Sequence, residues 1–93
     1  MILRFLVKGR VQGVGFRWFV YREAAQLQLR GWVRNTDEGE LEAVVAGQPE
    51  ALESLRRSLV RGPRGSRVDG LEEFPLPASE ELALEPFRIE GAW

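Results

Sequence analysis

Residues 9–17, with the sequence GRVQGVGFR, combine three glycines with an arginine in a pattern that can bind an anion. Gly9, Gly13 and Gly15 can adopt backbone conformations that other residues avoid, so that successive N–H groups converge on one point. Arg17 follows directly and carries a bidentate charged donor that suits phosphate oxygens. The pattern predicts a phosphate-binding loop, although a plain glycine-rich connection with a surface arginine fits the spacing equally well.

The loop differs from the common nucleotide-binding loops. It lacks the terminal Gly-Lys-Ser/Thr of a Walker A motif, and its glycines do not have the spacing and parallel-sheet context of a dinucleotide fingerprint. If a helix begins near Phe16, its first amides and its positive dipole end face the same point as the loop. Arg17 near a helix N-terminus is otherwise mildly unfavourable, and a bound anion would reverse that penalty.

The composition restricts the chemistry. The 93 residues include no cysteine and no histidine, which excludes thiol chemistry, a histidine base and the usual zinc ligand sets. Asp37, Glu38, Glu40 and Glu42 could suggest a carboxylate metal site. Strand alternation, however, places Glu40 and Glu42 on one outward face, which favours a solvated strand surface. We therefore expect neither a metal nor a cofactor.

Size and charge restrict the partners. A chain of 93 residues predicts one domain over residues 1–93. The net charge of -1 and the pI of about 5.5 disfavour a nucleic-acid binder, so no nucleic-acid partner is expected. The N-terminal apolar run is too short and too interrupted for a signal peptide or a membrane span. We expect a cytoplasmic monomer without a membrane partner.

Hydrophobic periodicity predicts the elements that must position the loop. Alternation of apolar residues indicates strands, and apolar residues three and four apart indicate helices. The predicted strands are residues 2–8, 32–36, 40–46 and 68–74, with a short last strand at 87–89. The predicted helices are residues 16–27 and a second helix that begins at Pro49 and stops at Gly62.

This order of elements is the βαββαβ motif of ferredoxin-like folds. We therefore predict an α+β sandwich in which two helices cover one face of an antiparallel sheet and leave the other face open, with a short C-terminal strand added. The fold carries enzymes, metal chaperones, regulatory modules and RNA binders, so the order of elements does not specify the chemistry.

Two stretches indicate a particular chemistry by resemblance. GRVQGVGFR resembles the N-terminal signature of the acylphosphatase family, and GWVRNTDEGELEAVVAG at 31–47 resembles its second signature. The resemblance continues through the second predicted helix to GPRGSRV at 62–68 and is weakest in the fourth strand and the glutamate-rich tail. It implies metal-free hydrolysis of a small-molecule acyl phosphate, a carboxyl-phosphate mixed anhydride, to a carboxylate and inorganic phosphate.

The resemblance also implies roles for single residues. Arg17 would bind the substrate phosphate, Asn35 would position the attacking water, and Thr36 would support Asn35. Spacing alone favours a turn-forming role for Asn35, because asparagine is common before turns. The catalytic pair expected is Arg17 and Asn35, and the residues expected to contact substrate are Gln12, Gly13, Val14, Gly15, Phe16, Arg17 and Thr36.

This chemistry is consistent with a site that has no base. An acyl phosphate is already activated by its carboxylate leaving group, so positioning and electrostatic stabilisation suffice for most of the catalysis. The amide of Asn35 cannot take a proton at neutral pH, but it can accept one hydrogen bond from water and donate another to substrate. The proton would leave through a substrate oxygen or bulk solvent.

Two alternatives use the same fold without this catalysis. An RNA-binding module has the same order of elements, but GVGFRWF precedes the first helix, whereas the aromatic RNA-binding motif lies on an inner strand. The second alternative is a non-catalytic module that binds phosphate-containing ligands. An acylphosphatase-like domain with a regulatory or substrate-handling role would resemble the N-termini of hydrogenase maturation carbamoyltransferases. Those chains are much longer, so we expect a stand-alone enzyme.

Three further residues carry expectations about structure. Gln28 stands where members of the family often have glycine after the helix. If Gln28 is left-handed, the cost is about 1 kcal/mol of stability, with no effect on catalysis. Phe19 and Trp32 are expected in the core or on a sheet face rather than as substrate platforms.

Overall fold

The computed structural model describes residues 1–91, except for the side chains at positions 82 and 83. Its elements are β1 (Ile2–Arg10), α1 (Phe16–Gln26), β2 (Arg30–Asn35), β3 (Leu41–Ala46), α2 (Pro49–Arg61), β4 (Arg67–Pro75), the 3-10 helix η1 (Ala78–Ala83) and β5 (Arg88–Ile89). The predicted βαββαβ order is confirmed. The short helix η1 lies in a stretch for which periodicity predicts no element.

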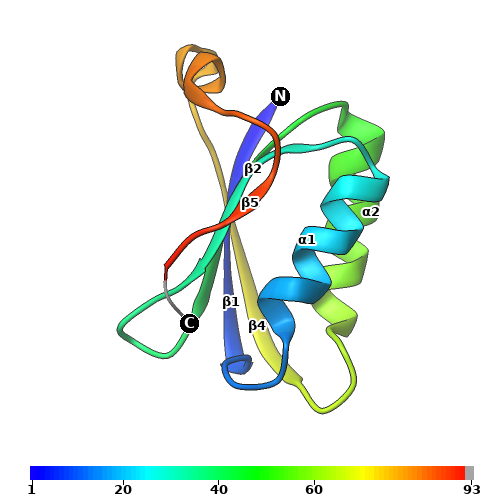
Figure 1. The fold of residues 1–93 in the computed structure, drawn as a ribbon, viewed down its shortest axis with the longest axis vertical. Coiled ribbons are helices and arrows are strands. Elements are labelled where there is room, and N and C mark those ends of the chain that lie inside the picture. The colour runs from blue at the N-terminus through cyan, green and yellow to red at the C-terminus, as the bar shows by residue number, and fades with distance from the viewer. Residues whose placement is uncertain (92–93) are drawn as a thin grey trace.

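The strands form one sheet in the order β4-β1-β3-β2-β5, and both helices lie on the same side of it (Figure 1). The four longer strands pair antiparallel, as predicted. The short β5 pairs parallel to β2, with Trp32 opposite Arg88, so the sheet is mixed. The reason is the crossing at η1: the chain leaves β4 at one end of the sheet, crosses there to the other edge, and returns alongside β2 (Figure 1).

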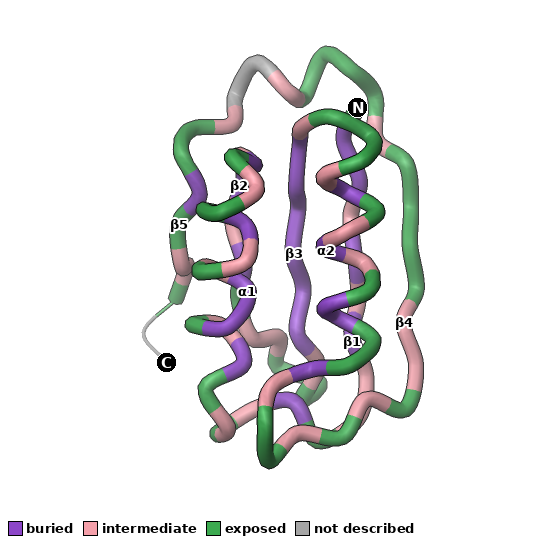
Figure 2. Tube along the Cα trace, turned by 90° about the vertical axis from the view of Figure 1, so that its right-hand side faces the viewer, coloured by how far each residue is buried: buried purple, intermediate pink, exposed green. Residues whose placement is uncertain are grey.

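The core lies between the helices and the sheet. β3 is buried along its whole length, whereas β4 at the edge is largely exposed (Figure 2). The predicted stripes are confirmed, because the cluster of buried side chains includes Leu3, Phe5, Val7, Phe16, Val20, Ala24, Leu41, Ala43, Val45, Leu52, Leu55 and Leu59. Phe19 belongs to the same cluster, and Trp32 packs on the opposite sheet face, as expected.

The prediction of a solvated face for Glu42 is wrong. Glu42 is 5% exposed, because β3 is the central strand and apolar side chains cover this face as well. Arg4 Nε and Arg34 Nε donate hydrogen bonds to its two carboxylate oxygens at 2.5 and 2.6 Å. Burial favours a higher pKa, but the hydrogen bonds and charges of the two arginines outweigh it and hold the pKa of Glu42 below its usual range. Glu42 is therefore a structural anion.

Gln28 has φ of 58°, the left-handed conformation for which glycine is favoured. It ends α1 in a Schellman motif: its N–H bonds the carbonyl of Ala25 at 3.1 Å, and the N–H of Leu29 bonds that of Ala24 at 2.9 Å. The side chain of Gln28 is exposed and forms no hydrogen bond within the described residues. The strain expected from the sequence is thus present in the fold.

Gln28→Gly is expected to raise the free energy of unfolding by about 0.5–1 kcal/mol, because relief of the left-handed strain outweighs the added entropy of the unfolded chain. The matched control is Gln26→Gly, which places glycine in the last helical turn and should lower stability by about 0.5–1 kcal/mol. Urea unfolding of both variants measures the difference. Destabilisation by both glycines to the same extent would contradict the assignment of strain to Gln28.

Candidate active site

The loop between β1 and α1 contains two glycines in the left-handed conformation. Gly13 has φ of 74° and Gly15 has φ of 76°. A Cβ atom added at either position would have no heavy atom within 4 Å, so backbone conformation, not space, requires glycine here. Within residues 1–91, no hydrogen-bond acceptor is provided to the N–H groups of Gly13, Val14 and Gly15. These amides are available to an anion.

Gly9 has a different role from the one expected. It lies within β1 at the point where the register with β4 shifts between Lys8 and Gly9. A Cβ atom on Gly9 would come within 2.1 Å of the carbonyl oxygen of Arg67, so glycine is needed for close approach of two backbones. Gly9 therefore allows the register shift near the end of β1, after which pairing with β4 continues to Arg10, and it is not assigned to the anion-binding amides.

Helix α1 begins directly after this loop. Gly15 is its N-cap residue and forms no side-chain capping bond, and no acidic residue lies in the first turn. The N–H of Phe19 bonds the carbonyl of Gly15 at 3.1 Å and closes the first turn. The amides before it have no partner inside the helix, and the positive dipole end is uncompensated by any carboxylate in that turn. An anion at this position would interact favourably with both.

Gln12 connects the loop to the hairpin between β2 and β3. Its Nε2 donates to the carbonyl oxygens of Thr36 at 2.9 Å and Glu40 at 3.0 Å. Thr36 closes the hairpin: its N–H bonds the carbonyl of Glu40 at 2.9 Å, and its hydroxyl accepts from the N–H of Glu40 at 3.1 Å. These bonds fix the position of the hairpin, and with it that of Asn35, relative to the loop.

Asn35 is the last residue of β2 and pairs with Leu41. Its Oδ1 atom is buried and has no hydrogen-bond partner among the residues that the structure describes. A buried acceptor of this kind is rare, because nearly all buried polar atoms are paired with protein or with ordered water. The structural alternative, in which the Asn35 side chain closes the turn, leaves this oxygen unexplained. The residue Asn35 itself borders both cavities described below.

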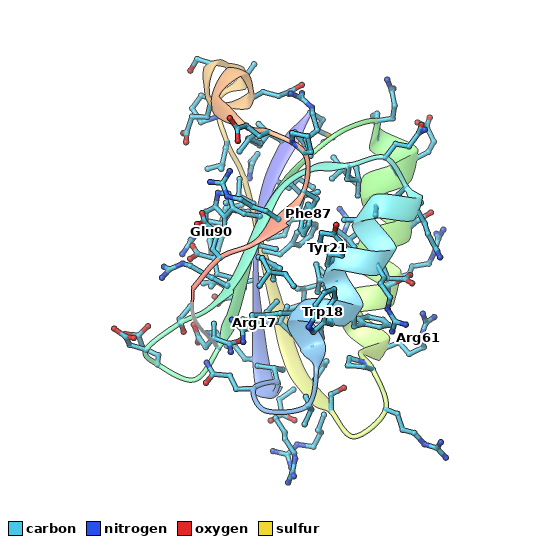
Figure 3. The ribbon with its side chains drawn as sticks, in the orientation of Figure 1. Arg17, Trp18, Tyr21, Arg61, Phe87 and Glu90 are labelled. Carbon is cyan, nitrogen blue, oxygen red and sulfur yellow. The ribbon has the colours of Figure 1, made fainter. Side chains whose placement is uncertain are left out.

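Arg17 points from the first turn of α1 toward the C-terminal segment (Figure 3). Its Nη1 lies 3.5 Å from the carbonyl oxygen of Glu90. Glu90 is held beside β2 by a bond from its N–H to the carbonyl of Val33 at 2.8 Å. The segment around Glu90 thus forms a wall of the site that the sequence patterns do not predict, because its position depends on the pairing of β5 with β2.

Two cavities meet at the predicted catalytic pair. The larger, of about 830 Å³, is bordered by Gly13, Gly15, Phe16, Arg17 and Asn35 on the loop side. The smaller, of about 360 Å³, is bordered by Gln12, Arg17, Asn35, Thr36 and Glu90. The structure therefore brings together every predicted site residue except Val14, whose side chain packs against the core.

Sequence reasoning missed Trp18 and Tyr21, which also border the larger cavity. Their spacing of three residues, off the buried stripe of α1, is the signal that could have found them.

No helix in the described part of the chain is long and apolar enough to cross a membrane. Among residues 1–91, no group of three or more acidic side chains is arranged to hold a metal ion. The charged residues that border the cavities are Arg17 and Arg88 at the larger one, and Arg17, Asp37 and Glu90 at the smaller one.

A ferredoxin-like sandwich whose glycine-rich loop and helix N-terminus face an amide oxygen across a cleft has the architecture of an enzyme that acts on a phosphoryl group. The family model described as Acylphosphatase matches residues 3–89, and the chain belongs to this family. It hydrolyses acyl phosphates, as the two sequence signatures imply.

Individual relatives agree with this assignment. The chain is 52% identical to an acylphosphatase of Koribacter versatilis over 97% of its own length and 80% of the relative. The crystal structure of acylphosphatase from Bacillus subtilis matches with a TM-score of 0.87 and 36% identity, over 98% of this chain and 100% of that one. Full-length HypF in the phosphate- and nucleotide-bound form matches with a TM-score of 0.84 and 31% identity, but over only 12% of its length.

Proposed function

We propose that Arg17, the Gly13–Gly15 loop and Asn35 together catalyse metal-free, in-line attack of water on an acyl phosphate. The observation that carries this proposal is the buried Oδ1 of Asn35, which lacks a partner among the described residues, together with the position of Asn35 beside Arg17 at both cavities. Gly13 and Gly15 border the larger cavity as well, and the backbone amides of this loop are suited to a phosphate. One cleft therefore offers donors for the phosphoryl oxygens and an acceptor for a water.

The phosphoryl group occupies the loop, where the amides of residues 13–15 and the first turn of α1 donate hydrogen bonds to its oxygens. Arg17 adds a charged donor that stabilises the negative charge of the transition state. Val14 contributes its backbone N–H, because its side chain is turned into the core. Phe16 contributes the first helical amide, and its ring anchors the helix in the core.

Asn35 Oδ1 accepts a hydrogen bond from water and directs the water oxygen at phosphorus. The new P–O bond forms as the bond from phosphorus to the acyl oxygen breaks, and the carboxylate leaves with that electron pair. The water proton passes to a phosphoryl oxygen or to solvent, so the products are a carboxylate and inorganic phosphate. Asn35 holds the water without titrating. Gln12 and Thr36 support this step by fixing the hairpin.

Hydrolysis of benzoyl phosphate by the purified protein is expected to proceed at an unchanged rate, within about twofold, after dialysis against EDTA. The reason is that the backbone amides and Arg17 supply the positive charge that a metal ion supplies in other phosphoryl-transfer enzymes. A continuous absorbance assay with and without added magnesium measures the effect. Loss of most activity in EDTA, restored by a divalent cation, would contradict the metal-free mechanism.

We also propose that residues 1–93 act as one domain, because both helices pack on one sheet over a shared core, and as a monomer, as the sequence predicts. Gel filtration of the purified protein tests the monomer. The cytoplasmic location and the lack of a nucleic-acid partner stay predictions from the sequence.

A further inference from the structure

The larger cavity extends beyond the phosphate-binding loop along an aromatic wall. Trp18, in the first turn of α1, is 62% exposed although it is the largest side chain on that helix. Its ring meets that of Tyr21 at 5.6 Å between centroids, and Tyr21 meets Phe87 at 6.4 Å. Figure 3 shows Phe87, Tyr21 and Trp18 one below the other near the middle of the view, with Arg17 beside Trp18. Trp18 is thus exposed and Tyr21 is half-buried, whereas Phe87 is 8% exposed and forms the buried end of the row. An exposed aromatic side chain that borders a cavity commonly marks a binding surface.

The wall is continuous with the proposed reaction centre. Trp18 and Tyr21 border the same cavity as Arg17 and Asn35, and Trp18 directly follows Arg17 in the chain. The other apolar side chains bordering it are Val11, Phe16, Phe87 and Ile89. A phosphoryl group held by the first turn of α1 therefore has this wall within reach of the group bonded to it.

The two cavities also separate the two ends of an in-line reaction. Arg17 and Asn35 border both cavities, but the smaller cavity is bordered chiefly by polar residues, among them Gln12, Thr36 and Asp37. In-line displacement places the attacking water and the leaving group on opposite sides of phosphorus. Water suits the polar side, so the acyl group is left with the aromatic side.

The charge at the far end of the wall disfavours an anionic acyl group. Arg88 borders the larger cavity and is the cation nearest to Phe87 in sequence. Its guanidinium already pairs with Glu90 at 3.2 Å and with Glu85 at 3.6 Å. A carboxylate or second phosphate on the acyl group would meet these two carboxylates beside one arginine. An uncharged apolar group would meet the aromatic rings instead.

We propose that the enzyme prefers acyl phosphates with an aromatic or other large apolar acyl group, and that Trp18 determines this preference. The inference rests on the proposed function, because the acyl group is placed from a phosphoryl group bound at Arg17. Trp18, Tyr21 and Phe87 form the acyl-binding wall. Trp18 contributes most to selectivity, because it is the exposed member of the wall.

The first test compares benzoyl phosphate, acetyl phosphate and succinyl phosphate as substrates of the wild type and of Trp18→Ala. We expect the wild type to have a KM for benzoyl phosphate about tenfold below those of the other two substrates. Trp18→Ala should raise the KM for benzoyl phosphate by about five- to tenfold and change that for acetyl phosphate by less than about twofold. Inhibition by inorganic phosphate should be unchanged, because phosphate does not reach the wall.

Two further variants separate binding from structure. Trp18→Phe keeps an aromatic face and should retain most of the preference. Phe74→Ala is the matched control, because Phe74 is another exposed aromatic residue (40%) but lies on β4 at the opposite edge of the sheet. It should leave the preference unchanged. Equal changes in KM for all three substrates in Trp18→Ala, or a wild-type preference for succinyl phosphate, would overturn the proposal.

Binding of non-hydrolysable analogues tests the wall without turnover. Benzoylphosphonate should bind the wild type about tenfold more tightly than acetylphosphonate by calorimetry, and Trp18→Ala should lose that difference. If the wild type hydrolysed none of the substrates but kept this binding preference, the proposed mechanism would fail while the acyl-binding wall would stand. If both phosphonates bound equally well, the wall would fail whatever the activity.

Discussion

Arg17→Ala should reduce kcat/KM for an acyl phosphate by about 10³-fold, the loss typical when a charged group that stabilises a phosphoryl transition state is removed. The same variant should weaken inhibition by inorganic phosphate by about tenfold or more, because a hydrogen bond to a charged group contributes about 1.5–3 kcal/mol. The fold should persist, since alanine is favourable in the first helical turn and the dipole no longer faces a cation. Steady-state kinetics and phosphate competition measure both effects.

The matched control for this substitution is Arg22→Ala, which removes an exposed arginine from the same helix. It should leave kcat/KM and phosphate inhibition within about twofold of the wild type, because exposed charges contribute little. Arg17→Lys should recover part of the phosphate affinity but little turnover, since lysine keeps the charge without the planar bidentate fork. Full activity of Arg17→Ala, or an equal loss in Arg22→Ala, would contradict the role of Arg17.

Asn35→Ala is expected to lower kcat by about 10²–10³-fold while the inhibition constant for phosphate changes by less than about twofold. The split follows from the structure: Asn35 carries no charge, and its buried Oδ1 lacks a partner among the described residues. Removing an unpaired buried oxygen should also leave the free energy of unfolding equal or slightly higher. Kinetics, phosphate inhibition and urea unfolding on the same preparation measure all three quantities.

Asn35→Asp separates the water-positioning role from a purely structural one. The aspartate keeps the size and one acceptor oxygen but places a negative charge beside the phosphate, so phosphate binding should weaken as well. Thr36→Ala is the control for the hairpin, because it removes the hydroxyl that accepts the Glu40 N–H while leaving Asn35 in place. Equal losses of phosphate affinity in Arg17→Ala and Asn35→Ala would refute the division of roles.

The site is assembled from three parts of the chain that are distant in sequence. The loop and α1 supply phosphate donors, the end of β2 supplies Asn35, and the segment after β5 supplies the Glu90 carbonyl, 73 positions from Arg17. Gln12 and the pairing of β5 hold these parts in register. The helix α1 thus carries Arg17 and the strand β2 carries Asn35, so that rigid elements set the distance between them, while the loop supplies the amides.

Local patterns were sufficient to predict much of this protein. Period-2 and period-3.6 spacing predicted every long element, since those signals depend only on residues a few positions apart. The left-handed conformation of Gln28 was raised as a condition by the glycine that family members often have at this position, and the structure has it. The roles of Arg17 and Asn35 likewise came from resemblance to a family; physical reasoning about the loop alone reached only a plausible anion site.

Tertiary structure decided the features that depend on contacts between distant residues. The burial of Glu42 required the covering of the second sheet face, and the role of Gly9 required the carbonyl of Arg67 across the bulge. The parallel pairing of β5 and the wall containing Trp18 depend on where the chain returns after η1. Apart from the spacing of Trp18 and Tyr21, these features leave no periodic signal, because side-chain period reports which face of an element is buried and not which segment covers it.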